Sequence, residues 1–293
     1  MTGVSPLIPI IAGGLFAIGC LIGAFFSLRR KRIIDDTPTS KTQGVFIGQV
    51  ELKGTAESEN PLSSYLASVK CVQYSWNIEE HWSRTVVETY TDSKGHVQTR
   101  TRTESGWTRV ADGVDSTPFY LKDDTGVIRI LPDGANIQGN QTFNETCTPS
   151  SSLYYGKGPL NSVANSTHKR RFTETAIPLH TMLYIMGRSR ERQDIVAVEI
   201  ARDNISNLFL ISTRSEKQIS SGYAIWYWVL IVSGLLISGC SGLVWAMIIS
   251  PNSGLNWQPI IIMIFGYFFI FLFSWVLSTY NKLINLHHQA GLT

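Results

Sequence analysis

The residues of this sequence best suited to chemistry are four cysteines and six histidines, and their spacing favours structural roles. Cys71 and His81 could act as a nucleophile and its base, but both lie in a stretch with strand-like alternation. Such positions more often hold a cysteine that packs as a small hydrophobe and a structural histidine. We therefore expect neither to be catalytic. Cys71 could pair with Cys147 only if the domain faces an oxidising compartment.

Carboxylates and glycines are not spaced as metal or phosphate sites require. Asp123, Asp124 and Asp133 could surround a cation, yet Asp-Asp-Thr-Gly is first of all a turn sequence. The 293 residues contain no Cys-x-x-Cys pair and no glycine-rich phosphate loop. We expect no catalytic residue, no metal ion and no bound cofactor.

Basic residues form two candidate contact sites. The first, which could bind anionic lipid headgroups, consists of Arg29, Arg30, Lys31 and Arg32. The second, a basic face for a partner or a lipid, would combine Arg100, Arg102, Arg109 and Lys169-Arg170-Arg171. Solvated strand faces often have the second composition, and the first is also a topology signal. A net charge of +3 is too small to indicate nucleic acid as a partner.

Almost all charged residues lie in the middle of the chain. The candidate side chains in this stretch must therefore be positioned by one soluble domain. The chain is 16% charged, but residues 1–28 carry no charge and residues 223–293 carry only Lys282. The stretch between them has about one charge in four residues, as a soluble domain does. The order is membrane, one domain, membrane, which excludes a soluble enzyme and a polytopic transporter.

Three apolar runs are long enough to cross a bilayer, which takes about 20 residues. They give a first transmembrane helix with its short tail (1–28), a second (223–249), a third (259–280) and a C-terminal tail (281–293). A basic juxtamembrane linker (29–43) follows the first helix. That helix is expected to be a retained anchor, because basic residues follow its apolar run and none precede it. The spans contain no acidic residue, which argues against a pump or carrier.

Lysine and arginine near the span ends predict the orientation. They follow span one, precede span two at Arg214 and Lys217, and follow span three at Lys282. We expect an integral membrane protein with the N-terminus outside and the domain and C-terminus in the cytoplasm, in the plasma or inner membrane if the source is bacterial. Four Asn-x-Ser/Thr sequons would indicate the opposite side if glycosylated, at Asn140, Asn144, Asn165 and Asn204. Such tripeptides are common by chance, so the basic flanks take precedence.

Small residues recur at four-residue spacing in the spans. Span one has Gly19 and Gly23, and span two has Gly234, Ser238, Gly242 and Ala246. Both stripes would let helices approach closely. We expect them to serve packing among the three helices of one chain, with homo-oligomerisation as the alternative.

The domain at 44–220 is predicted to be β-rich, with the strands of a small barrel or sandwich. A hairpin is expected at Arg84–Tyr90 and His96–Thr103, and another at Pro118–Lys122 and Gly126–Leu131. Residues 138–169 show no sustained periodicity and are interpreted as a loop or insertion. The fold class is therefore a β-rich soluble domain inserted between transmembrane α-helices.

Several blocks of this domain occur together in one known family. They are Gly48-Gln49-Val50-Glu51, Pro61-Leu62-Ser63-Ser64, Cys71-Val72-Gln73-Tyr74, Glu79-Glu80-His81-Trp82, Gly106-Trp107, Pro118 to Gly126, Phe172 to Pro178, Leu183 to Gly187 and Phe209-Leu210-Ile211-Ser212. The domain resembles the GIDE domain, also called the "beside a membrane" (BAM) domain. That domain is known from mitochondrial ubiquitin ligases such as MULAN (MAPL) and from prokaryotic relatives without the ligase part.

The resemblance implies a membrane-anchored module without ubiquitin-transfer chemistry of its own. In the ligases, activity lies in a RING finger after the second span, and a RING needs paired zinc ligands. Here a third span follows instead. We expect a non-enzymatic interaction or scaffold module, linked to membrane stress or organisation, with the bilayer and a protein near the membrane as partners. The alternative is a ubiquitin-ligase family member that acts with a separate catalytic subunit.

Overall fold

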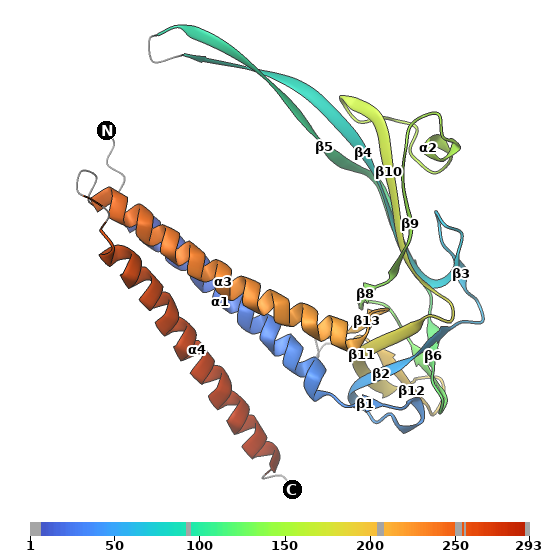
Figure 1. Cartoon of the computed structure of the whole chain (residues 1–293). Coiled ribbons are helices and arrows are strands. Elements are labelled where there is room, and N and C mark those ends of the chain that lie inside the picture. The colour runs from blue at the N-terminus through green and yellow to red at the C-terminus, as the bar shows by residue number, and fades with distance from the viewer. Residues whose placement is uncertain (1–6, 92–94, 204–207, 250–253, 255, 291–293) are drawn as a thin grey trace. The chain divides into compact units, whose positions relative to one another are not determined.

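The computed structural model describes residues 7–91, 95–203, 208–249, 254 and 256–290. They belong to two compact units (Figure 1). One unit is Thr37–Ser215, and the other contains the residues before and after it. A β-rich domain between apolar helices is therefore confirmed as the fold class.

The first sheet of the domain closes into a five-stranded barrel. Its strands are β2 (Gly48–Glu57), β6 (Phe119–Lys122), β7 (Val127–Ile130), β12 (Val198–Ala201) and β11 (Met182–Glu191). Each pairs with the next in this order, and β11 closes the ring by pairing with β2 from Met182↔Thr55 to Ser189↔Gly48. Three short strands extend this sheet: β1 (Thr39–Ser40), β8 (Asn136–Gln138) and β13 (Leu210–Ser212).

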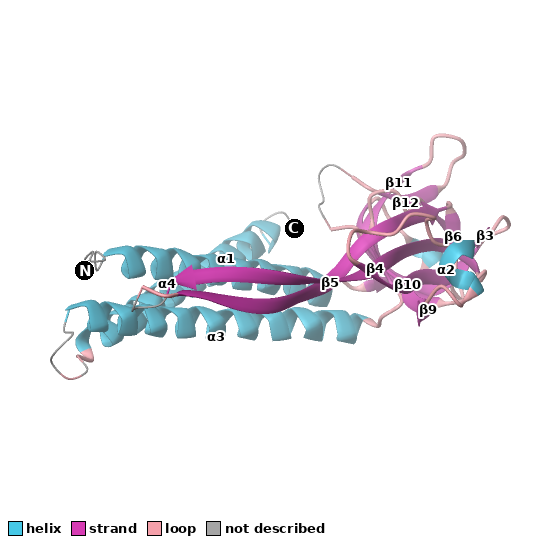
Figure 2. Cartoon of the chain, turned by 90° about the horizontal axis from the view of Figure 1, so that it is seen from above, coloured by secondary structure: helices cyan, strands magenta, loops and turns pink. Residues whose placement is uncertain are grey.

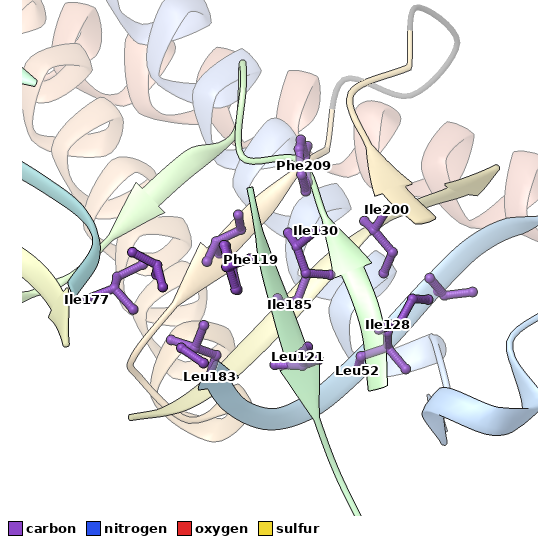
Figure 3. Close-up of a cluster of buried hydrophobic side chains, with 14 residues drawn as sticks. Leu52, Phe119, Leu121, Ile128, Ile130, Ile177, Leu183, Ile185, Ile200 and Phe209 are labelled. Carbon is purple, nitrogen blue, oxygen red and sulfur yellow. The ribbon is translucent and has the colours of Figure 1, made fainter. Parts of the chain in front are cut away.

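The barrel is held by one aliphatic core (Figure 3). Leu52, Leu121, Ile130, Ile185 and Ile200 are all 0% exposed. They come from five different strands. Alternate residues of a strand point to the same side, so each strand contributes side chains to the one core. Burying each such side chain contributes about 1.5–3 kcal/mol, so the barrel has enough core to be a rigid base for what is inserted into it.

The connectivity of the barrel is informative. Numbered along the chain, its five strands run 1-2-3-5-4 and back to 1, with one parallel pair, β7–β12, among antiparallel ones. This is the Greek-key connectivity of the OB-fold. It shows a shared architecture and carries no function by itself.

A second sheet is formed by two segments that connect barrel strands: one between β2 and β6, the other between β7 and β11. It contains β3 (Leu62–Ser63), β4 (Lys70–Thr91), β5 (Val97–Ser116), β10 (Ser166–Pro178) and β9 (Asn140–Cys147). β4 lies between β5 and β10, and β9 pairs with the other edge of β10. The short helix α2 (Ser152–Gly156) covers this sheet, and Tyr154 packs with Ile78 and Phe172 in a separate core cluster.

Residues 138–169 are not a loop; they form part of the second sheet, which is inserted between strands of the barrel. β8 ends at Gln138, Asn140–Cys147 form β9, Ser152–Gly156 form α2, and β10 begins at Ser166. β9 is an edge strand whose side chains are mostly solvated, with Cys147 buried. It therefore lacks a regular apolar alternation, and backbone pairing with β10 defines it instead.

The predicted hairpins are confirmed, and the strands of the first one, β4 and β5, are longer than expected. Phe119–Lys122 pairs with Val127–Ile130, and β4 pairs with β5 out to Thr91↔Val97. The strand expected at Arg84–Tyr90 is the outer part of the single strand β4, which already begins at Lys70. No glycine or proline interrupts β4, so nothing in its sequence forces a turn.

The other unit is a bundle of three helices: α1 (Leu7–Asp36), α3 (Glu216–Ile249) and α4 (Gln258–Ala290). All three are long and apolar enough to cross a membrane, which indicates membrane association. The α3 stripe packs against α4: Tyr267 Oη donates to Ile231 O at 2.9 Å and Ser238 Oγ donates to Met263 O at 2.7 Å. This is the internal packing expected for the small residues.

Two helix ends continue past the apolar runs. α1 runs on to Asp36 and so includes the first part of the expected linker (29–43), and α3 already begins at Glu216. Ser220 Oγ donates to Asp35 Oδ1 at 2.6 Å and so joins these two ends. Gly23, of the first small-residue stripe, faces Leu230 of α3, whereas Gly19 has nothing within 4 Å of a built Cβ.

Candidate functional site

The cysteine and histidine singled out for chemistry lie far apart. Cys71 and His81 are both on β4, and ten strand residues at about 3.3 Å each separate them by roughly 33 Å. The buried Cys71 Sγ lies 3.9 Å from Leu62 O, and burial raises the pKa of its thiol to about 11. His81 Nδ1 lies 2.8 Å from Thr167 Oγ1, and its ring meets Trp107 edge-on. Both residues have structural roles.

The geometry also decides the question of a Cys71–Cys147 disulfide. Both thiols are free and buried. Cys71 lies opposite Pro178 of β10 and Cys147 opposite Arg170. Eight residues of β10 therefore separate them, about 26 Å at strand spacing. A disulfide needs Cα atoms within about 7 Å, so this fold does not allow the pairing.

The aspartates form a turn that ties down the chain entering the domain. Asp123 accepts hydrogen bonds from the Thr42 amide at 2.8 Å, the Thr42 hydroxyl at 2.7 Å and the Thr125 amide at 2.7 Å. Burial alone would raise the pKa of Asp123, but these bonds outweigh it and lower that pKa. Asp124 pairs with Lys41 at the surface. Among the described residues, no three His, Cys, Asp or Glu side chains gather to hold a metal ion.

The expected basic face is divided by the structure. Arg170 is fully buried, so it cannot belong to a surface. Arg171 donates to Glu79 at 2.9 Å and stacks over Trp107. Arg102 is paired with Glu104, so much of the local charge is compensated.

Arg170 instead forms a buried ion pair with Glu80. Its Nε and Nη2 donate to Glu80 Oε2 at 3.0 and 2.9 Å, and both side chains are 0% exposed. Its remaining donors bind the carbonyls of Tyr154 (3.0 Å), Pro159 (2.7 Å) and Asn161 (3.0 Å). The pair therefore pins the segment around α2 to the second sheet, and all its polar groups are satisfied, as a buried charge requires.

The most exposed feature of the domain is a two-stranded arm, defined as residues 83–91 of β4 and 97–105 of β5. β10 pairs with β4 only as far as Ser166↔Trp82, so the arm has no third strand. Nine residues at about 3.4 Å per residue make it about 30 Å long. Figure 2 shows β4 and β5 extending beyond the rest of the sheet. Its exposed apolar side chains are Val87 (60%), Tyr90 (52%) and Val97 (70%).

The two faces of the arm differ in chemistry. One face presents charges in cross-strand positions, with Arg84 opposite Glu104 and Glu88 opposite Arg100. Arg84 Nη2 donates to Glu104 Oε2 at 2.7 Å. The other face is uncharged; in the described residues it consists of Ser83, Thr85, Val87, Thr89, Thr91, Val97, Thr99, Thr101, Thr103 and Ser105. The sequence indicated the hairpin and its alternation, but not that both faces stay solvated.

The tetrabasic cluster lies on the last turns of α1. Arg29 and Arg30 are exposed, Lys31 pairs with Asp35, and Arg32 Nη1 donates to Ser278 Oγ at 3.4 Å. Arg29 and Arg30 are therefore the members best placed for lipid headgroups, and headgroup contact stays a prediction.

The sequons lie in different settings. Asn140 and Asn144 are exposed on β9, and Asn140 Oδ1 accepts from Thr213 Oγ1 at 2.8 Å. Asn165 precedes β10 with a positive φ of 57°. Asn204 lies outside the described residues. Their glycosylation is not tested by these positions.

Comparison with known proteins identifies the family. Neither curated proteins nor solved structures gave a match. A family model described as GIDE, E3 ubiquitin ligase, matches residues 87–245, more than half of the chain. The match begins within the arm, covers every strand from β5 to β13 and ends within α3. This chain, with its arm, barrel and flanking apolar helices, is therefore a member of the GIDE family.

Proposed function

We propose that this chain is a non-enzymatic interaction or scaffold module of the GIDE family, anchored in a membrane and concerned with membrane stress or organisation. The single observation that carries the proposal is the arm. An exposed β-ribbon offers unpaired backbone edges and a patterned face to an extended partner. The residues best suited to chemistry make structural contacts instead, as Cys71 and His81 illustrate.

Anchoring the domain in a membrane would limit which partners it can reach. Helices precede and follow the domain in the chain, so only molecules in or near the same membrane would meet the arm. The basic residues at the span ends support an outside N-terminus and a cytoplasmic domain and C-terminus. For a bacterial source the membrane would be the plasma or inner membrane, with the bilayer itself as one partner.

A second candidate function is a ubiquitin-ligase family subunit. The description of the matching family favours it, and the reaction would then require a separate protein that supplies RING zinc ligands. Crosslinking in native membranes followed by purification should recover that RING protein. Recovery of partners that all lack zinc-ligand pairs would remove this candidate.

The test of the interaction module is site-specific photo-crosslinking of the full chain in native membranes. A photoreactive residue at Thr99, on the arm, should capture discrete protein partners. The same residue at Glu59, exposed on the domain outside the arm, is the matched control. Equal capture at both sites, or none at Thr99, would contradict a role for the arm.

A shortened arm gives the loss-of-function counterpart. Deleting 86–102 and joining Thr85 to Thr103 by Asn-Gly keeps the native cross-strand pair and uses a favoured hairpin turn. Capture from the remaining arm positions should disappear while the unfolding temperature of the domain stays the same. Undiminished capture would show that partners bind elsewhere.

Orientation has its own measurement. A reporter fused after Thr293 should be active in the cytoplasm, and a cysteine placed at Glu59 should be protected from impermeant maleimide in intact cells. A reporter active on the outside would overturn the orientation proposed here.

A further inference from the structure

β5 is a long strand with only one partner. It runs from Val97 to Ser116, and in the described part of the chain it pairs with β4 alone. Proteins shield such edges with short strands, proline, bulges or charged side chains, lysine above all. β5 is 20 residues long and contains no lysine and no proline, although it has a bulge at Val110 and six charged side chains. The corresponding open edge of β4 covers only residues 83–91. β5 is therefore the edge best suited to accept another strand.

The two ends of β5 carry charges of opposite sign. Arg100 and Arg102 lie toward the tip of the arm and Asp112 and Asp115 toward its base, with Glu104 and Arg109 between them. A parallel neighbour of the same sequence would place like charges together. An antiparallel neighbour can place Arg100 of one copy beside Asp115 of the other, which favours that pairing. The strand is thus complementary to itself in one direction only.

A bulge in β5 determines which of its residues share a face. The β4 partners shift between Ile78↔Ala111 and Glu79↔Arg109, so Val110 is the extra residue. Arg100 therefore lies on the same face as Asp115, because their β4 partners Glu88 and Tyr74 have the same parity. A twofold pairing that keeps each side chain on its own face can place Trp107 opposite its own copy. If Val110 is left out of the pairing, Arg100 and Asp115 are each seven positions from Trp107. Arg100 then lies directly opposite Asp115 of the second copy.

We infer that the partner of this edge is a second copy of the same chain, bound through antiparallel pairing of the two β5 strands around Trp107. The sheet then continues from one copy into the other, with an Arg100–Asp115 pair on each side of the twofold axis. This inference rests on the proposed interaction role and names its partner. It concerns the strand edge, which leaves the faces of the arm accessible to other molecules.

Charge reversal tests the pairing in the full chain reconstituted in detergent or nanodiscs. Arg100→Asp and Asp115→Arg should each raise the dimer dissociation constant about tenfold, because each replaces two cross-strand attractions by repulsions. The double variant Arg100→Asp/Asp115→Arg should restore wild-type dimerisation. Within one chain the two residues are roughly 45 Å apart along β5, so the rescue can arise only between chains. Dimerisation is measured by mass photometry or by energy transfer between labelled copies.

Cysteine crosslinking tests the register independently. Trp107→Cys should form a disulfide-linked dimer on mild oxidation, because residues on the axis face their own copies. Thr99→Cys should not, since its own copy lies far along the partner strand. A mixture of Thr99→Cys and Ser116→Cys copies should crosslink, which keeps the test valid if loss of Trp107 impairs folding.

The outcomes separate this inference from the proposed function. A monomeric wild type, or single variants without rescue in the double variant, would overturn homotypic pairing. If Thr99 then still captures other proteins, the interaction role stands and only its partner is different. If Thr99 captures neither another protein nor a second copy, both proposals fail.

Discussion

Glu80 and Arg170, ninety positions apart in the sequence, form an ion pair whose two side chains are completely buried between the second sheet and α2. The next residues in each strand, Glu79 and Arg171, form a similar pair on the opposite face of the same two strands, where solvent reaches it. Adjacent residues thus make the same chemical contact in two different environments, and each pair is a control for the other.

Replacing Glu80 by Gln should destabilise the domain by about 3–5 kcal/mol, because Arg170 would keep a buried charge without its counterion. For a domain of this size we expect the unfolding temperature to fall by about 10 °C. Thermal unfolding of the full chain in detergent, followed by tryptophan fluorescence, measures the effect. Glu79→Gln should cost at most about 1 kcal/mol, since its pair is partly exposed. Similar losses for both variants would show that burial is not decisive.

The Asp123 carboxylate should make the domain sensitive to acid. Its pKa is lower in the folded chain than in the unfolded chain, where it is about 3.9. The stabilisation is therefore complete above pH 4 to 5 and is lost as the pH falls through the folded pKa. Asp123→Asn should cost about 1.5–3 kcal/mol at pH 7, the range for hydrogen bonds to a charged group, and should weaken the acid dependence.

Asp124→Asn is the matched control for that experiment. Asp124 and its partner Lys41 are largely solvated, so the expected change is at most about 1 kcal/mol. Urea unfolding at pH 7 and at about pH 2 compares the two variants, because the loss of the Asp123 contribution occurs below the unfolded pKa. Equal effects at both positions would contradict the assignment of Asp123 as the anchor of the Thr42 segment.

Cys71 should resist alkylation in the folded chain. Burial raises the pKa of its thiol to about 11, and the thiolate is the reactive species. At pH 7.5, peptide-level mass spectrometry after iodoacetamide treatment should find Cys71 unmodified, and modified once the chain is denatured. A cysteine introduced at Thr99 on the arm should react at the rate of a free thiol. Rapid modification of Cys71 in the folded chain would reopen a chemical role.

Helix packing in the other unit can be tested with two neighbouring glycines. A Cβ added at Gly242 would lie 2.6 Å from Ile260 Cα, whereas at Gly239 its nearest neighbour would be Ile264 Cδ1 at 3.9 Å. Gly242→Ala should therefore force α3 and α4 apart, at a cost of about 1–3 kcal/mol. Gly239→Ala should have little effect. Crosslinking between cysteines introduced on the facing sides of α3 and α4 reports the separation, and an unchanged yield for Gly242→Ala would contradict this packing.

The sequence predicted what depends on local pattern. The split in charge predicted the apolar helices, and Asp123-Asp124-Thr125-Gly126 predicted the turn between β6 and β7. Sequence patterns could not single out Arg170 within Lys169-Arg170-Arg171, because all three residues look solvated until β10 is placed in register with β4. The length of β4 could have been predicted, since no glycine or proline separates Glu79 from Arg84. β9 gave little signal, because an edge strand is defined more by its partner than by its own side chains.

The hydrogen bond between Ser220 and Asp35 has a consequence for modularity. It shows that the chain leaves one helix and enters the next at neighbouring points, with the whole domain inserted between them. α1 and α3 therefore form a helical hairpin in which the folded domain takes the place of the connecting loop. A flexible linker of about six residues, which spans roughly 13 Å, should be enough to bridge the gap after excision. A different domain whose termini lie close together could be inserted between the same two ends, so the helical hairpin could anchor other domains in a membrane.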